Sequence, residues 1–415
     1  MATIILGGGL IGVTTAYYLA KSGRDVTVIE RNSGVGEETS FQNGALLAPG
    51  HSQAWATPGA TWTLIKSLFQ KDPALKFRLS SNPQFWRWGM KFLGFCTAEH
   101  YRTNSLRVFR CMNAGMMELR ELAQSTGIDY DANDNGILYL FRSDESLKAR
   151  QDDWTILQDQ GLRLEKADVS KCVEIEPTLE PVAHQIGGGF YSPDEGAGDA
   201  YVFTCALAKH CEDLGVTFKY ETHIERLHKE RGSISGVETN KGTFSADDYV
   251  LALGPYSPIL GRQVGLDLPI WPVKGFTASI PVNGHNQAPR VGIIEEDNLV
   301  AFAHLGNRLR IGGKADFAGY DNAYTKDDFY GVLKVAKDLF PLAGNYERAR
   351  YWACLRPASA AGPPILGPSP VDNLYLNCGH GAAGWTMGCA TSRAVADIIC
   401  ERQPEIDMEG LTLNG

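Results

Sequence analysis

The first thirty residues constrain the fold more than any other part of the chain. An apolar run at 3–6 predicts a buried strand, the letters GGGLIG at 7–12 predict a tight turn, and 13–22 predict a helix that ends at Gly23. A second strand is expected over 25–30. Strand, glycine turn, helix and strand in this order are typical of a βαβ unit that binds a dinucleotide.

The glycines of this turn have separate physical roles. Gly7 allows the turn, Gly9 lets a pyrophosphate approach the backbone, and Gly12 lets the helix pack on the strand. The start of the helix offers free N–H groups and a positive dipole to the phosphates. Glu30 ends the second strand, where its carboxylate can accept hydrogen bonds from both ribose hydroxyls of an adenosine and would repel a 2′-phosphate. The turn therefore predicts a dinucleotide site and disfavours NADP.

A polar segment beyond the second strand favours FAD over NAD. Residues 37–45 read EETSFQNGA, and they arrive where a flavin dinucleotide extended across the domain needs contacts to its pyrophosphate and ribityl chain. We expect the cofactor contacts in this part of the chain to be Arg31, Thr39, Ser40, Asn43 and Gly44.

Later stretches complete the predicted nucleotide domain. Residues 215–222 and 247–254 predict two strands, and the second carries the candidate contacts Ala252 and Gly254. Residues 373–377 predict another strand, followed by a glycine-rich turn that opens a helix running to about residue 400. A helix N-terminus suits the flavin pyrimidine edge, where negative charge accumulates on reduction. The contacts expected there are Gly379, Gly381, Gly384, Trp385 and Thr386.

The nucleotide pattern is therefore discontinuous. We expect an α/β, Rossmann-like FAD-binding domain made of residues 1–50, 191–260 and 361–415. Residues 51–190 and 261–360 lack that pattern and contain aromatic-rich strands and helices, so we expect them to form a substrate domain.

Composition excludes several classes of function. The formal net charge of −9 argues against nucleic-acid binding, because attraction to phosphates needs a basic surface. The 9 cysteines have neither CxxC nor CxxH spacing, so we expect no metal site and no disulfide framework. No basic leader and no apolar stretch of about 18 residues is present. We expect a cytoplasmic protein that is soluble or touches a membrane only with its surface.

Motifs along nearly the whole chain, from about residue 3 to residue 400, resemble the D-amino-acid dehydrogenase small-subunit family. That family lies within the wider D-amino-acid oxidase and glycine oxidase group of flavoproteins. The resemblance implies an FAD domain beside a substrate domain built on a large mixed or antiparallel sheet, of α+β type. It rests on the N-terminal βαβ unit, ETSFQNGA, VLALGPYS (250–257), PVKGFT (272–277), RIGGKAD (310–316), CLRPASAAGPPILG (354–367) and GHGAAGWTMGCA (379–390).

The resemblance also implies site residues. Arg356, in CLRP, matches the arginine taken to bind the substrate carboxylate in the oxidase group, and a planar guanidinium suits that task. Lys274, in PVKG, resembles a lysine near the flavin of related amine oxidases and would stabilise reduced flavin or hold a water; a surface lysine is the alternative. Apart from the resemblance, His51, Ser52 and Trp55 follow the segment 37–45 directly, so they would face the pocket and select the substrate, unless they belong to an ordinary loop.

The implied reaction is oxidative deamination of D-amino acids to 2-oxo acids and ammonia by hydride transfer from Cα to flavin N5. Electrons would then pass to a quinone or another carrier. Because the flavin supplies the chemistry, we expect no triad, no metal and no necessary general base. Oxidation of a secondary amine of the proline, sarcosine or glycine type, or of a 2-hydroxy acid, stays an alternative, and so does a flavoprotein without catalysis.

Two residues near the expected flavin keep alternatives open. Cys354 matches the position where some sarcosine-oxidising relatives attach flavin through cysteine sulfur, but free cysteines are commonly inert, and we expect FAD to be bound without a covalent link. His380 could touch the isoalloxazine or be a structural histidine.

Residues 62–96 combine aromatic and basic side chains in an unusual density. Such a mixture suits a helix lying on anionic lipid, on the cytoplasmic face of the inner membrane, close to a quinone. The alternative is a helix pair that packs over the substrate domain. The residues concerned are Trp62, Lys66, Leu68, Phe69, Lys71, Lys76, Phe77, Arg78, Phe85, Trp86, Arg87, Trp88, Lys91, Phe92, Leu93 and Phe95.

Overall fold

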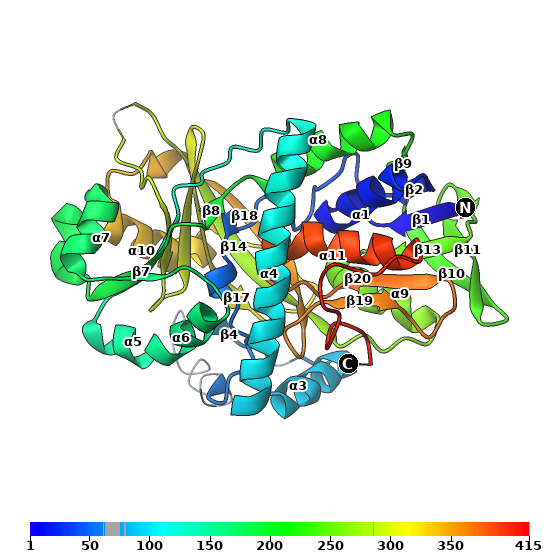
Figure 1. The fold of residues 1–415 in the computed structure, drawn as a ribbon, viewed down its shortest axis with the longest axis horizontal. Helices are drawn as coiled ribbons and strands as arrows, with labels where there is room; N and C mark the ends of the chain where they lie inside the picture. Colours follow the sequence, from blue (N-terminus) through cyan, green and yellow to red (C-terminus); the bar gives the residue numbers. More distant parts are fainter. Residues whose placement is uncertain (61, 63–74, 79, 285, 415) are drawn as a thin grey trace.

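A six-stranded sheet carries the N-terminal glycine turn. The computed structural model describes residues 1–60, 62, 75–78, 80–284 and 286–414, and two sheets dominate it (Figure 1). In the six-stranded sheet all neighbours are parallel except β19 and β20. Its strands, in spatial order, are β19 (Ile365–Pro368), β20 (Leu374–Cys378), β13 (Asp248–Leu251), β1 (Ala2–Leu6), β2 (Asp25–Ile29) and β9 (Thr217–Lys219). The strands expected from the sequence thus join one sheet.

Four helices pack together around one face of this sheet. They share a core that contains Val13, Leu119, Phe203 and Val395. Gly115 of the long helix α4 approaches the start of α11 so closely that a Cβ there would come 2.3 Å from the carbonyl oxygen of Thr386. In Figure 1 these two helices lie against each other near the centre of the molecule. The helices are α1 (Leu10–Lys21), α4 (Ala98–Thr126), α8 (Ala200–Asp213) and α11 (Gly384–Ile399).

The second large sheet is mixed and has nine strands. Most neighbours are antiparallel, whereas β15 pairs with β5, and β17 with β4, in parallel. The order is β18 (Arg350–Ser359), β14 (Ile270–Pro281), β17 (Arg308–Asp316), β16 (Val300–Leu305), β15 (Gly292–Glu295), β5 (Ile137–Phe141), β7 (Gly188–Ser192) and β6 (Glu165–Ala167), with β4 (Leu75–Lys76) beside β17. This architecture confirms the expected combination of a Rossmann-like sheet with a mixed sheet.

Smaller elements complete the fold. An antiparallel sheet of β10 (Ile224–Glu230), β11 (Ser233–Thr239) and β12 (Gly242–Phe244) packs with α9 (Ser257–Gln263) against the six-stranded sheet. The strand pair β3 (Leu46–Leu47) and β8 (Gly196–Ala197) lies between the large sheets. The remaining helices are α3 (Pro83–Gly94), α5 (Asp144–Ala149), α6 (Gln151–Asp159), α7 (Val169–Ile175) and α10 (Tyr330–Leu339). Of the helices in the described residues, none is both long and apolar enough to span a bilayer.

Candidate flavin and substrate site

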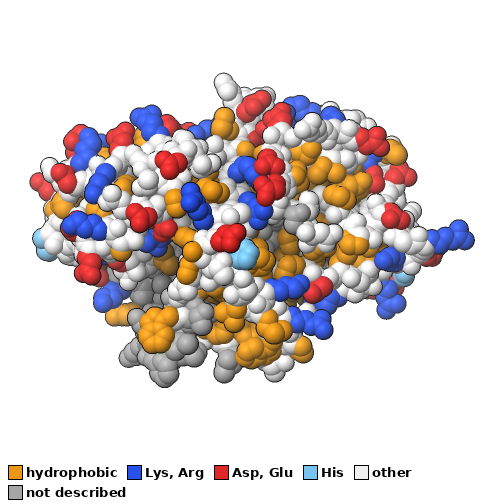
Figure 2. Space-filling view, turned by 60° about the horizontal axis from the view of Figure 1, so that its bottom comes forward, with side chains coloured by type: hydrophobic (Ala, Val, Ile, Leu, Met, Phe, Trp, Pro, Cys, Tyr) orange, Lys and Arg blue, Asp and Glu red, His pale blue; other side chains and the backbone are white. Residues whose placement is uncertain are grey.

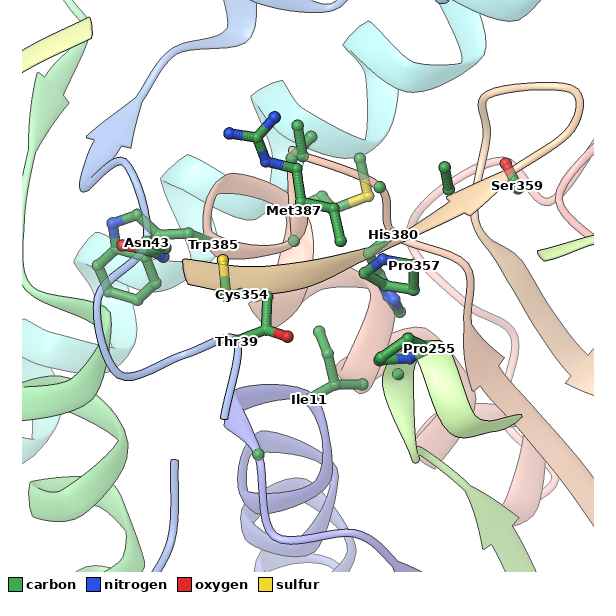
Figure 3. Close-up of a pocket in the computed structure, with 18 of the residues that line it drawn as sticks. Ile11, Thr39, Asn43, Pro255, Cys354, Pro357, Ser359, His380, Trp385 and Met387 are labelled. Carbon is green, nitrogen blue, oxygen red and sulfur yellow. The ribbon is translucent and has the colours of Figure 1, made fainter. Parts of the chain in front are cut away.

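One large cavity of about 860 Å³ is walled by both large sheets. Its walls include the C-terminal ends of β1, β2 and β13, the starts of α1 and α11, and strands β17 and β18. Figure 3 shows Ile11 of α1, Cys354 and Pro357 of β18, and Trp385 and Met387 of α11 around this space. The cavity lies where the six-stranded sheet presents its carboxyl edge, the usual place for a ligand in such sheets.

Most residues expected at the site line this cavity. Gly12, Gly379 and Lys274 do not, nor does Ser52, which is buried beside it. Those that line it are Gly7, Gly9, Glu30, Arg31, Thr39, Ser40, Asn43, Gly44, His51, Trp55, Ala252, Gly254, Arg356, His380, Gly381, Gly384, Trp385 and Thr386.

The glycine turn leaves no room for side chains. Gly7 has a φ of +110°, and a Cβ there would come 2.7 Å from the carbonyl oxygen of Ala252. A Cβ on Gly12 would come 1.8 Å from the carbonyl oxygen of Gly7, so Gly12 acts by packing rather than by lining the cavity. Helix α1 begins at Leu10 without a side-chain cap from Gly9, although Ser40 accepts a hydrogen bond from the Leu10 N–H at 3.1 Å. The turn is therefore a backbone cradle at a helix N-terminus, which fits a pyrophosphate.

Glu30 is a buried carboxylate at the end of β2. Its Oε2 accepts from the Gly8 N–H at 2.7 Å, and its Oε1 accepts from the Asn32 N–H at 2.8 Å. Burial raises the pKa of Glu30, and the two backbone hydrogen bonds oppose that shift. Neighbouring Arg31 pairs with Glu38 and lies 4.3 Å from the ring centroid of Tyr256. A carboxylate has further lone pairs, so this position fits the ribose hydroxyls of an adenosine.

The flavin segment 39–44 is bound to the nine-stranded sheet. Thr39 donates from Oγ1 to the carbonyl of Leu355 at 2.8 Å, and Arg310 donates from Nη1 to the carbonyl of Asn43 at 3.0 Å. Thr277 donates from Oγ1 to the carbonyl of Gln42 at 2.8 Å. These bonds place a segment that follows β2 across strands β14, β17 and β18, so it connects the two walls of the cavity.

The C-terminal glycine loop enters the cavity between β20 and α11. Gly379 and Gly381 have φ values of +78° and +55°, which favour glycine. Between them, buried His380 shares a hydrogen bond from Nε2 with Thr391 Oγ1 at 3.1 Å, and burial lowers its pKa to about 3. His380 is therefore neutral at physiological pH. Thr386 donates to the carbonyl of Leu46 at 3.3 Å and so links α11 to strand β3.

Arg356 reaches the cavity from β18. It pairs across the strands with Val273, and the pair Cys354 and Gly275 lies on the same face. A Cβ on Gly275 would come 2.6 Å from the guanidinium, so this glycine makes room for the arginine. Arg356 donates from Nη1 to the carbonyl of Lys314 at 3.3 Å, and in the described part of the chain no carboxylate lies within 4.0 Å of it.

Burial dominates the electrostatics of these two side chains. It lowers the pKa of Arg356, against the opposing influence of Cys354, and it raises the pKa of the Cys354 thiol. A guanidinium that is half-buried and has no counter-charge is costly, so this arrangement fits an anionic group of a ligand.

The structure does not bring Lys274 into the cavity, unlike the expectation from its motif. It pairs with Leu355 on the opposite face of β14 and β18 from Arg356, because successive side chains of a strand alternate between faces. Its Nζ donates to the carbonyl of Ala323 at 2.8 Å and lies 3.5 Å from Oδ2 of Asp321. The sequence motif does not give the register of β14 against β18, and that register decides which face of the sheet carries Lys274.

His51 ends the short 3₁₀ turn Pro49–His51 and lies beside charged residues that the sequence did not single out. Its Nδ1 is 3.6 Å from Oε1 of buried Glu296, and Arg150 Nη2 is 3.9 Å from the other oxygen of Glu296. Arg150 lines the cavity as His51 does. The letters GIIEED at 292–297 contained a signal for Glu296, because acidic residues are rarely buried and these follow an apolar run. Nothing in those letters identified His51 as its partner.

Comparisons with known proteins agree with this geometry. Residues 2–398 match the model of the FAD dependent oxidoreductase (DAO) family. The chain belongs to this family. It is 40% identical over 416 residues to D-amino acid dehydrogenase 2 of Mesorhizobium japonicum, with 100% of both chains covered, and 41% identical to D-amino acid dehydrogenase of Azorhizobium caulinodans, with 100% of this chain and 99% of the relative covered.

Solved structures share the fold at lower identity. Glycine oxidase from Geobacillus kaustophilus has a TM-score of 0.76 at 22% identity, with 99% of this chain and 97% of that chain covered. L-proline dehydrogenase from P. horikoshii has a TM-score of 0.77 at 20% identity, with 99% and 96% covered. The chain is thus an FAD-dependent oxidoreductase, as the polar segment 37–45 and the family resemblance predicted, and the residues around the cavity fit that cofactor.

Proposed function

We propose that this enzyme deaminates D-amino acids oxidatively to 2-oxo acids and ammonia. The observation that carries the proposal is Arg356, a half-buried guanidinium that lines the cavity without a carboxylate partner among the described residues. It would bind the substrate α-carboxylate through two parallel hydrogen bonds and so orient Cα. The D handedness is supported by the names of relatives about 40% identical over the full length.

The cofactor would be bound without a covalent link by residues from three parts of the chain. When bound, FAD supplies the capacity to accept a hydride equivalent. The turn Gly7–Gly12 and Glu30 would bind the dinucleotide, Thr39 to Gly44 would follow it, and Gly381 to Thr386 would meet the flavin end. Trp385 and Cys354 would exclude water around it, because both are buried in the cavity wall.

The proposal includes a two-domain organisation. Residues 1–50, 191–260 and 361–415 would form the FAD-binding domain, which includes all six strands of the parallel-rich sheet. Residues 51–190 and 261–360 would form the substrate domain, which includes most of the nine-stranded sheet. Helix α4 comes from the second group and packs on α11 of the first, so it would keep the two domains in fixed contact.

We also propose that electrons leave to a quinone at the cytoplasmic face of the inner membrane. Helix α3 buries Phe85, Trp88 and Phe92 and exposes Trp86, Met90 and Leu93, which lie on one side at helical spacing. Figure 2 shows hydrophobic side chains gathered at the lower edge of the molecule, where Figure 1 places α3. Lys66, Leu68, Phe69 and Lys71 of the predicted lipid-binding segment lie outside the described residues.

Helix α3 contacts the cavity with one face and carries basic residues on the other. Its buried residues Trp88 and Phe92 line the same cavity as Arg356, and its exposed face carries Arg87 and Lys91, of which Lys91 pairs with Asp267 at 3.0 Å. An apolar face with basic neighbours suits anionic lipid. Partitioning onto anionic vesicles should therefore weaken when Trp86, Met90 and Leu93 are all replaced by serine; unchanged partitioning would contradict the membrane part of the proposal.

Anaerobic mixing tests the reaction directly. The yellow holoenzyme is mixed with D- and L-amino acids, glycine, sarcosine, proline and 2-hydroxy acids, and flavin absorbance is followed. Bleaching by D-amino acids but not by their L-forms is the expected result. Bleaching by a secondary amine or a hydroxy acid alone would replace the proposed substrate, and no bleaching by the whole panel would contradict the proposal.

A further inference from the structure

One wall of the cavity holds a buried acid that the proposed reaction does not use. The carboxylate of Glu296 is 1% exposed, and neither of its oxygens has a hydrogen-bond partner among the described residues. Its nearest charged neighbours are His51 Nδ1 at 3.6 Å and Arg150 Nη2 at 3.9 Å. The Nδ1 of His51 also lacks a hydrogen-bond partner in that part of the structure. Such groups are costly to bury unless a charge is gained next to them.

Arg150 is shared between Glu296 and a second acid, so His51 is needed to balance the negative charge of Glu296. Arg150 has a second acid, Asp153, with Oδ2 3.1 Å from its Nε. Tyr101 of α4 also lies beside Asp153, and its pKa is raised mainly by burial and then by that acid. One guanidinium therefore stands between two carboxylates, and an imidazolium at His51 would balance the second.

Glu195 holds the turn that carries His51 in place. Glu195 accepts from the Gly50 N–H at 2.5 Å and from the Tyr139 hydroxyl at 2.6 Å. A Cβ on Gly50 would come 2.6 Å from the Tyr139 hydroxyl oxygen, so the turn is closely packed. With Nδ1 near Glu296, the other ring nitrogen, Nε2, is left for a ligand in the cavity, and the side chain of His51 is 38% exposed.

The other histidines that line the cavity are less suited to take a proton from a substrate. His380 is buried, shares a hydrogen bond with Thr391, and has a pKa lowered to about 3 by burial. His223 follows Thr222, whose N–H donates to the carbonyl of Glu30, so it lies at the adenosine end. His51 thus combines access to the cavity with a buried acid behind the ring.

We propose that His51, backed by Glu296, accepts the ammonium proton of the bound amino acid. In this step an N–H bond of the substrate ammonium breaks, an Nε2–H bond forms, and the electron pair stays on the substrate nitrogen as the lone pair of the neutral amine. Glu296 stabilises the imidazolium, and the proton later leaves to solvent at the exposed edge of His51. Separations longer than a hydrogen bond in a ligand-free site commonly shorten when substrate binds.

The inference rests on the proposed function and assigns its proton acceptor, which the sequence did not require. The test uses 2-aminoisobutyrate, which has the carboxylate and ammonium of a substrate but no Cα–H to transfer. Its binding to the holoenzyme is measured by calorimetry between pH 5 and pH 9. We expect affinity to fall toward the acidic end of this range, because a ring that already carries a proton can neither accept another nor tolerate an ammonium beside it.

Two variants and one control separate proton acceptance from shape. In His51→Asn the fall in affinity at low pH should disappear, and binding near pH 8 should weaken by about tenfold. In Glu296→Gln the fall should remain but begin at lower pH, because the ring loses the buried acid that stabilises its added proton. His184→Asn removes a histidine that does not line the cavity and should behave as the parent.

The outcomes distinguish this inference from the proposed reaction. Parent binding that does not depend on pH, or a fall at low pH that persists in His51→Asn, would overturn the role of His51. A loss of affinity of equal size at every pH would mean that His51 contributes only shape, and would overturn it too. If D-amino acids do not bleach the parent flavin, the proposed function fails by itself, whereas parent bleaching with unaltered pH profiles in both variants contradicts this inference alone.

Discussion

The two ends of the cavity differ in how well their charged groups are paired. At the nucleotide end, Glu30 accepts two backbone hydrogen bonds and Arg31 is paired with Glu38. At the substrate end, Arg356 has no carboxylate partner and Glu296 has no hydrogen bond, within the residues that the structure describes. The nucleotide end is a preformed cradle, whereas the substrate end keeps one cation, Arg356, for which the described residues supply no counter-charge. A site for a permanent cofactor and a site for a transient substrate are thereby distinguished.

Removal of Arg356 should have the largest effect at the substrate end. Arg356→Met leaves the α-carboxylate of the substrate buried without a partner, so the rate of flavin bleaching at low substrate concentration should fall about a thousandfold, or about 4 kcal/mol. Bound FAD, measured by absorbance after gel filtration, should be unchanged. Arg356→Lys, which keeps the charge but loses the planar fork, is the matched control and should recover part of the rate. Equal activity of Arg356→Met and parent would show that the two ends do not differ as described.

Glu195, the buried acid that accepts a hydrogen bond from Gly50, should make the free energy of unfolding depend on pH. Burial raises the pKa of Glu195 to about 7, above the ordinary value of 4.5, against hydrogen bonds from Tyr139 and Gly50. The folded state then keeps a proton on Glu195 that the unfolded state has lost. The contribution of Glu195 to stability is therefore highest below about pH 4.5 and falls as pH rises to about 7.

Glu195→Gln isolates this effect because glutamine does not titrate. Between pH 5 and pH 8 the parent should lose about 2 kcal/mol relative to the variant in urea unfolding. Asp129→Asn, which replaces an exposed acid, serves as the control and should follow the parent. A stability difference that does not change with pH would contradict the raised pKa.

A side chain in the glycine turn should break the nucleotide end alone. Gly12→Ala places a Cβ 1.8 Å from the carbonyl oxygen of Gly7, so the turn must shift and FAD should bind about tenfold more weakly. Gly89→Ala on α3, where a Cβ meets nothing within 4 Å, is the matched control. Fluorescence titration of the apoprotein with FAD gives both affinities, and equal values would count against the cradle.

The smallest effect is expected on the far face of the sheet. Lys274→Met removes the hydrogen bond to Ala323 and the contact with Asp321, and should lower stability by about 1 kcal/mol. Because Lys274 does not face the cavity, flavin bleaching should change by less than about threefold. A large loss of bleaching rate with normal stability would show that Lys274 acts in the active site.

The sequence predicted the strands and helices around the glycine turn well because their physical requirements are local. Gly7, Gly12 and Glu30 lie within one βαβ unit, so their spacing alone fixes their relation to one another. The same holds for the loop 379–386 at the start of α11.

The substrate end depends on contacts between distant segments. Arg356 and Lys274 lie on neighbouring strands, and only the register of β14 against β18 decides which of them faces the cavity. His51 and Glu296 are separated by more than two hundred residues and meet through the packing of a turn against β15. No local pattern contains either relation, so the sequence could name Arg356 from a resemblance and His51 from its place after the segment 37–45, but could not find Glu296.

The strand order of the six-stranded sheet has a consequence for how the enzyme is made. Strand β1 at residues 2–6 pairs with β13, and β13 pairs with β20 at residues 374–378, so roughly 370 residues separate the ends of one continuous ladder. At a synthesis rate of about 5 to 20 residues per second, β1 emerges from the ribosome about 20 to 70 seconds before β20 does. Both neighbours of β1, the strands β2 and β13, emerge earlier, but β13 lacks its partner β20 until translation is almost finished. We expect cofactor loading to be late in the synthesis of the chain, because residues 380–387, which line the cavity, follow β20.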